Sequence, residues 1–141
     1  MKYHAYGALL QYEDPENAGT FINVAEIKDI SGPGESLDMV DSTTHTSPGA
    51  TREFLAGLLD PGEVSFAIAY DPEDTQGQSF LKESLRSRTE RTFRIVSKTT
   101  NNAFRKFDGY VMSFEPKDPV EGIIEADFAI KVTGQVSEGT V

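Results

Sequence analysis

The amino-acid sequence predicts a mainly β fold, an antiparallel β-sandwich or barrel with one flanking α-helix. Apolar and polar residues alternate with a period of two along several short segments, as in strands with one buried face. Clusters of Pro and Gly, such as 31–34 and 60–62, separate these segments and are typical of turns. A single segment has the apolar stripe and the end charges of a helix, which makes the chain mainly β.

The clearest predicted strand is 123–133, in which every second residue from Ile124 to Val132 is apolar. Residues 63–70 repeat this pattern. Apolar residues on both faces of 104–115 predict burial on both sides of that strand, whereas 21–30 is rich in strand-forming residues with mixed faces. The remaining predicted strands are 36–41 and 92–98.

The predicted helix runs from about Thr75 to Ser87. Acidic residues precede it and basic residues lie at its end, both of which suit the helix dipole. Phe80, Leu81 and Leu85 form a narrow apolar stripe that can pack on a sheet.

The length of 141 residues predicts one domain, 1–141. Within it we expect residues 1–17 to form an N-terminal arm or a flexible tail, 42–62 a long inter-subunit loop, and 136–141 a short C-terminal tail. Such a long loop is unusual in a compact domain and is often functional. The chain has no Cys, which excludes disulfides and thiolate metal sites, and no segment is apolar enough for a signal peptide or a membrane span.

No catalytic, cofactor-binding or metal-binding residues are predicted. Phosphate-binding, dinucleotide-binding, nucleophile-elbow and zinc-protease motifs are absent from the sequence. His4 and His45 lie in polar surroundings, and the sequence does not pair either of them with a poised Ser or Thr nucleophile. Glu125 and Asp127 lie on one strand face, but nothing predicts the apolar cleft that a glycosidase pair needs.

Charge is unevenly distributed. The net charge is −10, which argues against binding nucleic acid by phosphate neutralisation. Residues 82–106, however, hold eight Lys and Arg against Glu83 and Glu90, a net +6, so the rest of the chain carries −16. This asymmetry fits either a solvated face or a basic patch that meets an acidic patch on the next copy of the chain.

The order of three segments resembles a known family. Val24–Pro33 ends in a DI-x-GP-like turn, Asp41–Gly49 is a D-x-TT loop, and Arg52–Phe66 reads REFLAGLLDPGEVSF. Together they resemble the major tail tube protein family of long-tailed, non-contractile (siphovirus) bacteriophages, over about Ala18 to Val136. Arg52–Phe66 is the most specific part. The proline in Leu59-Asp60-Pro61 departs from the family pattern and leaves the shape of that turn open.

The resemblance implies a structural virion protein of the phage tail, assembled in the host cytoplasm, with no reaction and no cofactor. Six subunits would form a ring whose strands join in a barrel, and rings would stack into a tube through which double-stranded DNA passes without specific binding. Implied partners are further copies of the chain, the tail tip or baseplate and tail terminator proteins, and a tape measure protein in the lumen. No membrane is involved.

Two sets of residues follow from this comparison. The expected inter-subunit or inter-ring contacts are Thr44, His45, Thr46, Ser47, Pro48, Gly49, Arg52, Phe54, Leu55, Arg86, Arg88 and Arg91. The expected acidic residues facing the lumen are Glu125, Asp127, Asp108 and Glu115, because an acidic wall would repel DNA phosphates; ordinary solvent-facing acids are the alternative. Phe54, Leu55, Leu58 and Leu59 fit either the core or a subunit contact.

Two other functions remain open. The tube of a contractile tail or of a type VI secretion system would share this architecture, although the REFLAGL segment favours the long-tailed phage. A carbohydrate- or ligand-binding β-sandwich is the alternative of a different class. Such modules usually expose aromatic platforms or a calcium site, and this chain has no Trp and no convincing calcium loop.

Overall fold

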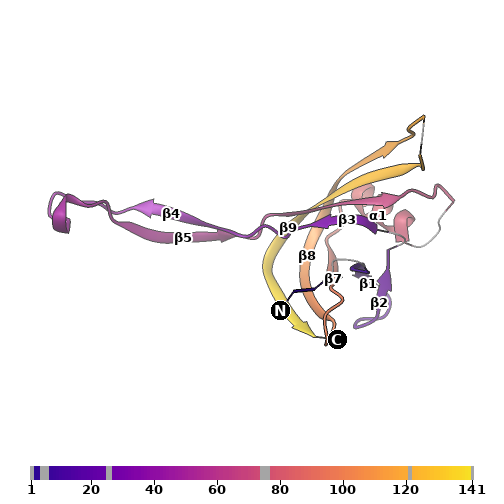
Figure 1. Cartoon of the computed structure of the whole chain (residues 1–141), viewed down its shortest axis with the longest axis horizontal. Helices are drawn as coiled ribbons and strands as arrows, with labels where there is room; N and C mark the ends of the chain where they lie inside the picture. Colours follow the sequence, from indigo (N-terminus) through magenta and orange to yellow (C-terminus); the bar gives the residue numbers. More distant parts are fainter. Residues whose placement is uncertain (1, 4–6, 25–26, 74–76, 121, 141) are drawn as a thin grey trace.

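The chain forms a rolled antiparallel sheet with one helix packed on it and a two-stranded arm that projects far from this body (Figure 1). This computed structural model describes residues 2–3, 7–24, 27–73, 77–120 and 122–140. The predicted fold class, mainly antiparallel β with one flanking helix, is confirmed.

The body and the arm are built from separate sheets. The seven-stranded sheet has the order β2-β1-β7-β8-β9-β6-β3. Its strands are β1 (Leu9–Glu13), β2 (Phe21–Asn23), β3 (Ile27–Ser31), β6 (Glu63–Ala69), β7 (Arg91–Val96), β8 (Ala103–Lys117) and β9 (Glu125–Thr140). The arm pairs β4 (Ser36–Asp41) with β5 (Phe54–Asp60), and a 3-10 turn, η1 (Pro48–Ala50), lies between these strands. The helix α1 covers Gly77–Ser87.

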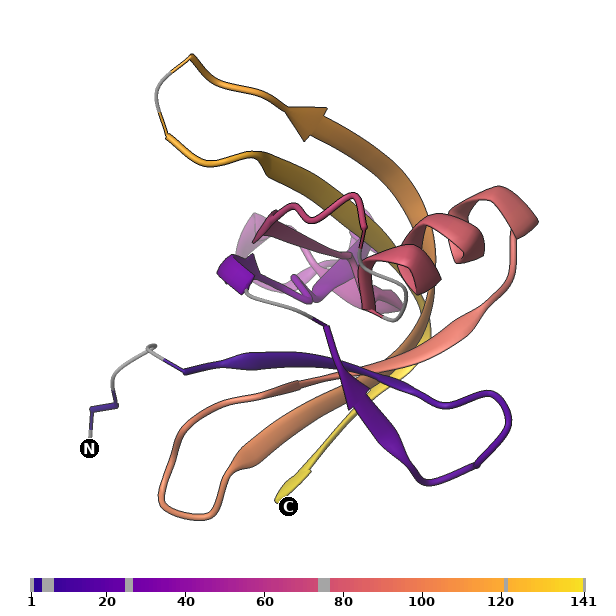
Figure 2. The same cartoon turned by 90° about the vertical axis from the view of Figure 1, so that its right-hand side faces the viewer.

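The long strands β8 and β9 hold the two halves of the rolled sheet together. β7 pairs with residues 104–109 of β8, and β6 pairs with residues 125–131 of β9. The two edge strands, β2 and β3, follow each other in the chain, so the sheet must curl to bring its edges together. Figure 2 shows the curled sheet with α1 beside the upper part of β8.

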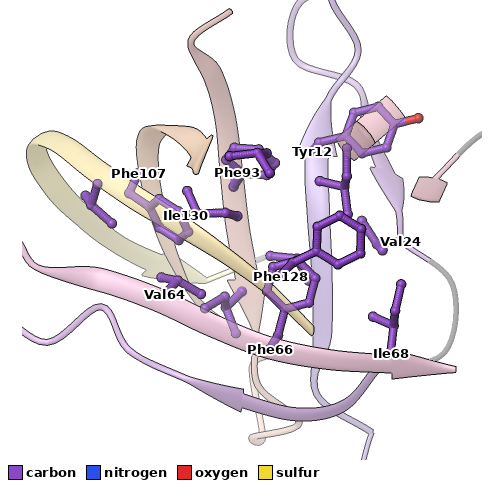
Figure 3. Packing of buried hydrophobic residues seen from close by; sticks show 14 of the residues in the cluster. Tyr12, Val24, Val64, Phe66, Ile68, Phe93, Phe107, Phe128 and Ile130 are labelled. Atoms are coloured by element: carbon purple, nitrogen blue, oxygen red, sulfur yellow. The ribbon is translucent and has the colours of Figure 1, made fainter. Parts of the chain in front are cut away.

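A hydrophobic core fills the inside of the roll (Figure 3). Alternation places Ala126, Phe128, Ile130 and Val132 of β9 inside, each at most 3% exposed, as the sequence predicts. Aromatic rings meet across the core: the ring centroids of Phe66 and Phe128 are 5.4 Å apart.

The helix is held on the body by both apolar and polar contacts. Leu81 is fully buried, and the ring of Phe80 stacks on Tyr12 with centroids 3.9 Å apart. Buried Gln78 donates to the carbonyl of Ala69 over 2.9 Å and accepts from the amide of Asp71 over 2.8 Å. These bonds fix the connection from β6 to the helix. The first two residues of the predicted helix, 75 and 76, lie outside the described part.

Both predicted terminal tails are corrected in part. Residues 9–13 of the expected 1–17 arm form β1, which lies between β2 and β7 and buries Leu10 and Tyr12. Most of the expected C-terminal tail at 136–141 is strand, because β9 continues to Thr140 and pairs with the start of β8. Gly134, with φ of 81°, lies where the pairing of β9 with β8 shifts register, so the alternation seen before it does not continue. Residues 1, 4–6 and 141 lie outside the described part.

Candidate assembly interface

The predicted loop at 42–62 is largely an antiparallel hairpin arm. Leu37 pairs with Leu59, Val40 with Leu55 and Asp41 with Phe54. Residues 54–60 are therefore a strand, which corrects the expectation of one long loop, whereas 42–53 connects the strands and includes η1. Every residue of β4 and β5 is exposed, in agreement with the isolated position of the arm in Figure 1.

Large apolar side chains on the arm are exposed and are not covered by the described part of the body. The large ones, each between 50% and 82% exposed, are Leu37, Met39, Val40, Phe54, Leu55, Leu58 and Leu59. The core alternative for Phe54, Leu55, Leu58 and Leu59 is therefore wrong. Exposed apolar surface this extensive is rare on a monomer and marks an interaction site.

Several polar groups at the tip of the arm form hydrogen bonds with one another. Thr43 donates its hydroxyl to the carbonyl of Glu53 and accepts the amide of Glu53 over 2.8 Å. The Ser47 hydroxyl accepts from the amide of Thr44 over 2.9 Å and donates to the carboxylate of Glu53 over 3.0 Å. The polar residues of this segment thus close the hairpin locally, and the apolar strands are the part that needs a neighbour.

The structure places the expected contact residues of this segment together on the arm. Thr44, His45, Thr46, Ser47, Pro48 and Gly49 form its tip, and Arg52, Phe54 and Leu55 lie on the returning chain, all in positions that are exposed or half-buried. Whether they contact a neighbour stays a prediction.

A carboxylate at the tip makes the local turn pH-dependent. Hydrogen bonds from the side chain and the backbone amide of Thr43 lower the pKa of Asp41 below its ordinary value of 3.8. A lowered folded-state pKa means that the turn is stabilised above the ordinary pKa and loses this contribution as pH falls through the folded value.

We expect the exchange protection of the Thr43 amide, corrected for the intrinsic rate, to fall between about pH 5 and pH 2. Hydrogen exchange followed by NMR measures this. Asp41→Asn is the control, because its protection should be lower at the start and independent of pH. Equal protection of the wild-type amide at both ends of this range would contradict the prediction.

The arm joins the body through the two chain segments around Gly32–Gly34 and Gly62, which we call the neck. At Gly32 and Gly62 the backbone has positive φ of 101° and 77°, which favours glycine. A Cβ at Gly62 would lie 2.2 Å from the carbonyl oxygen of Gly34, so the two chains of the neck touch there. Arg105 of β8 donates from Nη1 to the carbonyl of Gly32 over 2.9 Å and ties the neck to the body.

The expected basic contacts lie on the body, in and after α1. Arg86 is in the last turn of α1 and Arg88 follows it, far from the arm tip in Figure 1. Arg91 is used within the chain, because its Nε donates to Ser84 over 3.0 Å and its guanidinium lies 4.5 Å from the centroid of the Phe80 ring. Arg86 and Arg88 are therefore better placed for a partner than Arg91.

The four expected acidic residues share the outer face of the sheet. Glu115 pairs across the strands with Asp127, and Glu125 and Asp127 alternate with the buried residues of β9. Asp108 lies on the same face and accepts from the Thr92 hydroxyl over 2.6 Å. Lysines that sequence reasoning missed compensate part of this charge: Lys28 forms an ion pair with Glu125. Lys117 lies 2.6 Å from Asp127, which raises the pKa of Lys117.

Two features were not predicted from sequence. One is the hydrogen bond from Arg105 to the neck, because a basic residue in a strand gives no sign in the sequence of the partner that it will bind. The other is an unpaired edge: beyond residue 132, the side of β9 facing away from β8 has no strand partner in the described ranges. A prediction that extended this strand past Gly134 to Thr140 would have indicated the unpaired edge.

The described residues contain neither a metal-binding cluster of side chains nor a membrane-spanning helix. No group of three or more His, Asp or Glu side chains in this part is placed to hold a metal ion. Of the helices described, none is long and apolar enough to cross a membrane.

The fold is similar to that of chains from a tail and from an injection system. It superposes with a TM-score of 0.68 on a chain from the tail of an empty gene transfer agent particle refined with C6 symmetry, at 20% identity over 92% of this chain and 93% of that one. A chain from the sheath–tube complex of an extracellular contractile injection system, PVC, gives a TM-score of 0.73 at 12% identity, covering 99% and 93%.

Sequence comparison identifies the family. The family model described as lambda phage tail tube protein matches residues 4–139, so the chain belongs to the lambda phage tail tube protein family. It is 24% identical to structural protein 3 of Pseudomonas phage PAJU2, over 93% of this chain and 90% of that protein. The resemblance found in the sequence is thus confirmed, and the protein is a structural component of the phage tail.

Proposed function

We propose that this chain assembles into rings of six that stack as the tail tube, the conduit for DNA ejection, and that it catalyses no reaction. The projecting arm carries the proposal: its strands display apolar side chains that the body of the same chain does not cover. A structural protein that polymerises explains this surface, whereas a monomeric binding module does not. Six-fold symmetry is supported by the likeness to a tail refined with C6 symmetry.

Lateral contacts within a ring have a second candidate surface. The edge of β9 from Thr133 to Thr140 exposes backbone groups that no described strand pairs, and open edges invite pairing with another chain. Joining this edge to the sheet of the next subunit would continue the sheet around the ring and remove the edge.

The outer face that carries Glu115, Glu125 and Asp127 is the proposed lumen wall. Its carboxylates would repel DNA phosphates, and the lysines paired with them would keep that repulsion moderate. Double-stranded DNA would pass without specific binding, and before ejection the lumen would hold a tape measure protein. A tube reconstruction with these carboxylates on the outer wall would contradict the assignment.

Tail tip or baseplate proteins and a tail terminator are the proposed partners at the two tube ends. A second candidate function is the tube of a contractile tail, favoured by the likeness to the PVC sheath–tube chain. A sheath would then bind the outer wall, so co-assembly with a sheath protein separates the two.

Electron microscopy of negatively stained protein tests the proposed function. We expect rings or tubes from the purified wild-type chain at rising concentration. Deleting Thr44–Ala50 should reduce tube formation strongly, because it shortens the arm without touching the core. Its far-UV circular dichroism should keep the wild-type shape. A wild-type chain that stays monomeric at every concentration, also when tail tip proteins are present, would overturn the proposal.

A further inference from the structure

Both faces of the arm carry exposed apolar side chains, and this pattern limits how the arm can bind. Leu37 and Leu59 lie opposite each other on one face, and Met39 and Phe54 belong to that face by alternation. Val40 and Leu55 lie opposite each other on the other face. Leu58, the most exposed at 82%, lies where the pairing shifts register.

The exposure of the two faces is similar. Leu37, Met39 and Leu59 are 51%, 57% and 57% exposed, and Val40 and Leu55 are 54% and 62% exposed. A hairpin that lay on a single surface would bury one of these sets and leave the other in water. A two-stranded ribbon is also only marginally stable by itself, so contacts on both sides would support it.

We infer that the arm is a wedge whose two faces are buried at the same time against two different copies of this chain. The inference rests on the proposed tube and adds to it that one arm bridges two neighbouring subunits. Each copy would receive parts of two arms, and each arm would fix the relative position of two copies.

Charge supports copies of the same chain as the occupants. From Gly34 to Gly62 the acids are Glu35, Asp38, Asp41, Glu53 and Asp60, and Arg52 is the single Lys or Arg, a net charge of −4. The segment 82–106 of the body carries +6. Arg86 lies in the last turn of α1 and Arg88 follows it, and α1 lies on the body, far from the arm tip, where a neighbour's arm can approach without meeting its own (Figure 1).

The absence of native Cys allows a direct test with single thiols. Met39→Cys and Val40→Cys are a matched pair: the positions are adjacent, similarly exposed in the subunit at 57% and 54%, and on opposite faces. In free subunits both thiols should react with a maleimide at similar rates. In tubes we expect both rates to fall by about tenfold or more, because reaction of a thiol requires access to it. Tubes dissolved in denaturant give the full-labelling reference.

Cross-linking then counts the copies. Each variant, and the double variant, is labelled with a photoreactive maleimide and diluted into an excess of wild-type chains before assembly. Single variants should give a product of two chains, and the double variant a product of three.

The outcomes separate the two proposals. If one of the two thiols reacts in tubes as fast as in free subunits, the arm packs on one side and the wedge is wrong. Two-chain products alone from the double variant would mean that one copy covers both faces, which also overturns it. If wild-type chains form no tubes even with tail tip proteins present, the proposed tube fails, and the wedge fails with it.

Discussion

Phe128→Ala is expected to lower the free energy of unfolding of the subunit by about 3–5 kcal/mol, the usual cost of removing a buried phenyl ring. Phe128 is 2% exposed, and its ring lies 4.9 Å from that of Phe114 and 5.4 Å from that of Phe66, measured between centroids. The ring fills the space between β9, β8 and β6, so a cavity would remain there. Denaturant unfolding under conditions that keep the subunit monomeric measures this change.

Phe54→Ala is the matched control for this prediction. Phe54 lies on the arm and is 50% exposed, so its removal should change the unfolding free energy by less than about 0.5 kcal/mol. Phe54→Ala should nevertheless form fewer tubes than the wild type, although its fold is unchanged. Similar losses of unfolding free energy in both variants would mean that the arm packs on the body in solution.

Gly62→Ala is expected to disturb the neck and to prevent normal assembly. The φ of 77° strains any residue with a Cβ, at a cost of about 1–3 kcal/mol. The new Cβ would also lie 2.2 Å from the carbonyl oxygen of Gly34 in the opposite chain, so the neck must open and the arm must change direction. Electron microscopy should show few or no tubes, and unfolding should show the lost stability.

The same substitution at Gly34 serves as the control. Gly34 has no positive φ, and a Cβ there would meet nothing within 4 Å. Gly34→Ala should therefore assemble normally, with an unfolding free energy equal to or slightly above that of the wild type. Normal tubes from Gly62→Ala would show that the neck does not set the direction of the arm.

Alternation made several strands predictable. In β6 and in the first part of β9 one face is buried and the other is in water, so the period of two is visible in the sequence and the predicted ranges agree with the structure to within a few residues. The helix was predictable because Phe80, Leu81 and Leu85 lie on one side of it. β1 was missed because five residues give a short pattern and Leu9 precedes the buried Leu10.

The sequence predicted where the candidate site lies, but not that its apolar side chains are exposed. Phe54, Leu55, Leu58 and Leu59 have the composition of a core strand, and sequence alone does not tell whether another part of the same chain or a separate chain covers them. The family resemblance located the segment, whereas its exposure follows only from the fold. The ion pairs of Glu125 and Asp127 were also hidden, since Lys28 is distant from Glu125 in sequence and Lys117 faces Asp127 only after β8 and β9 pair.

The arm lies at one extreme of the molecule and the body with α1 lies on the other side, which gives a polymer built through the arm a direction (Figure 1). All arms of such a tube point the same way, so one end displays unoccupied arms and the opposite end displays unoccupied receiving surfaces. The two ends then differ chemically, and growth by addition of subunits proceeds at unequal rates at each. A protein that starts the tube and a protein that stops it would consequently have to recognise unlike surfaces, and neither could replace the other.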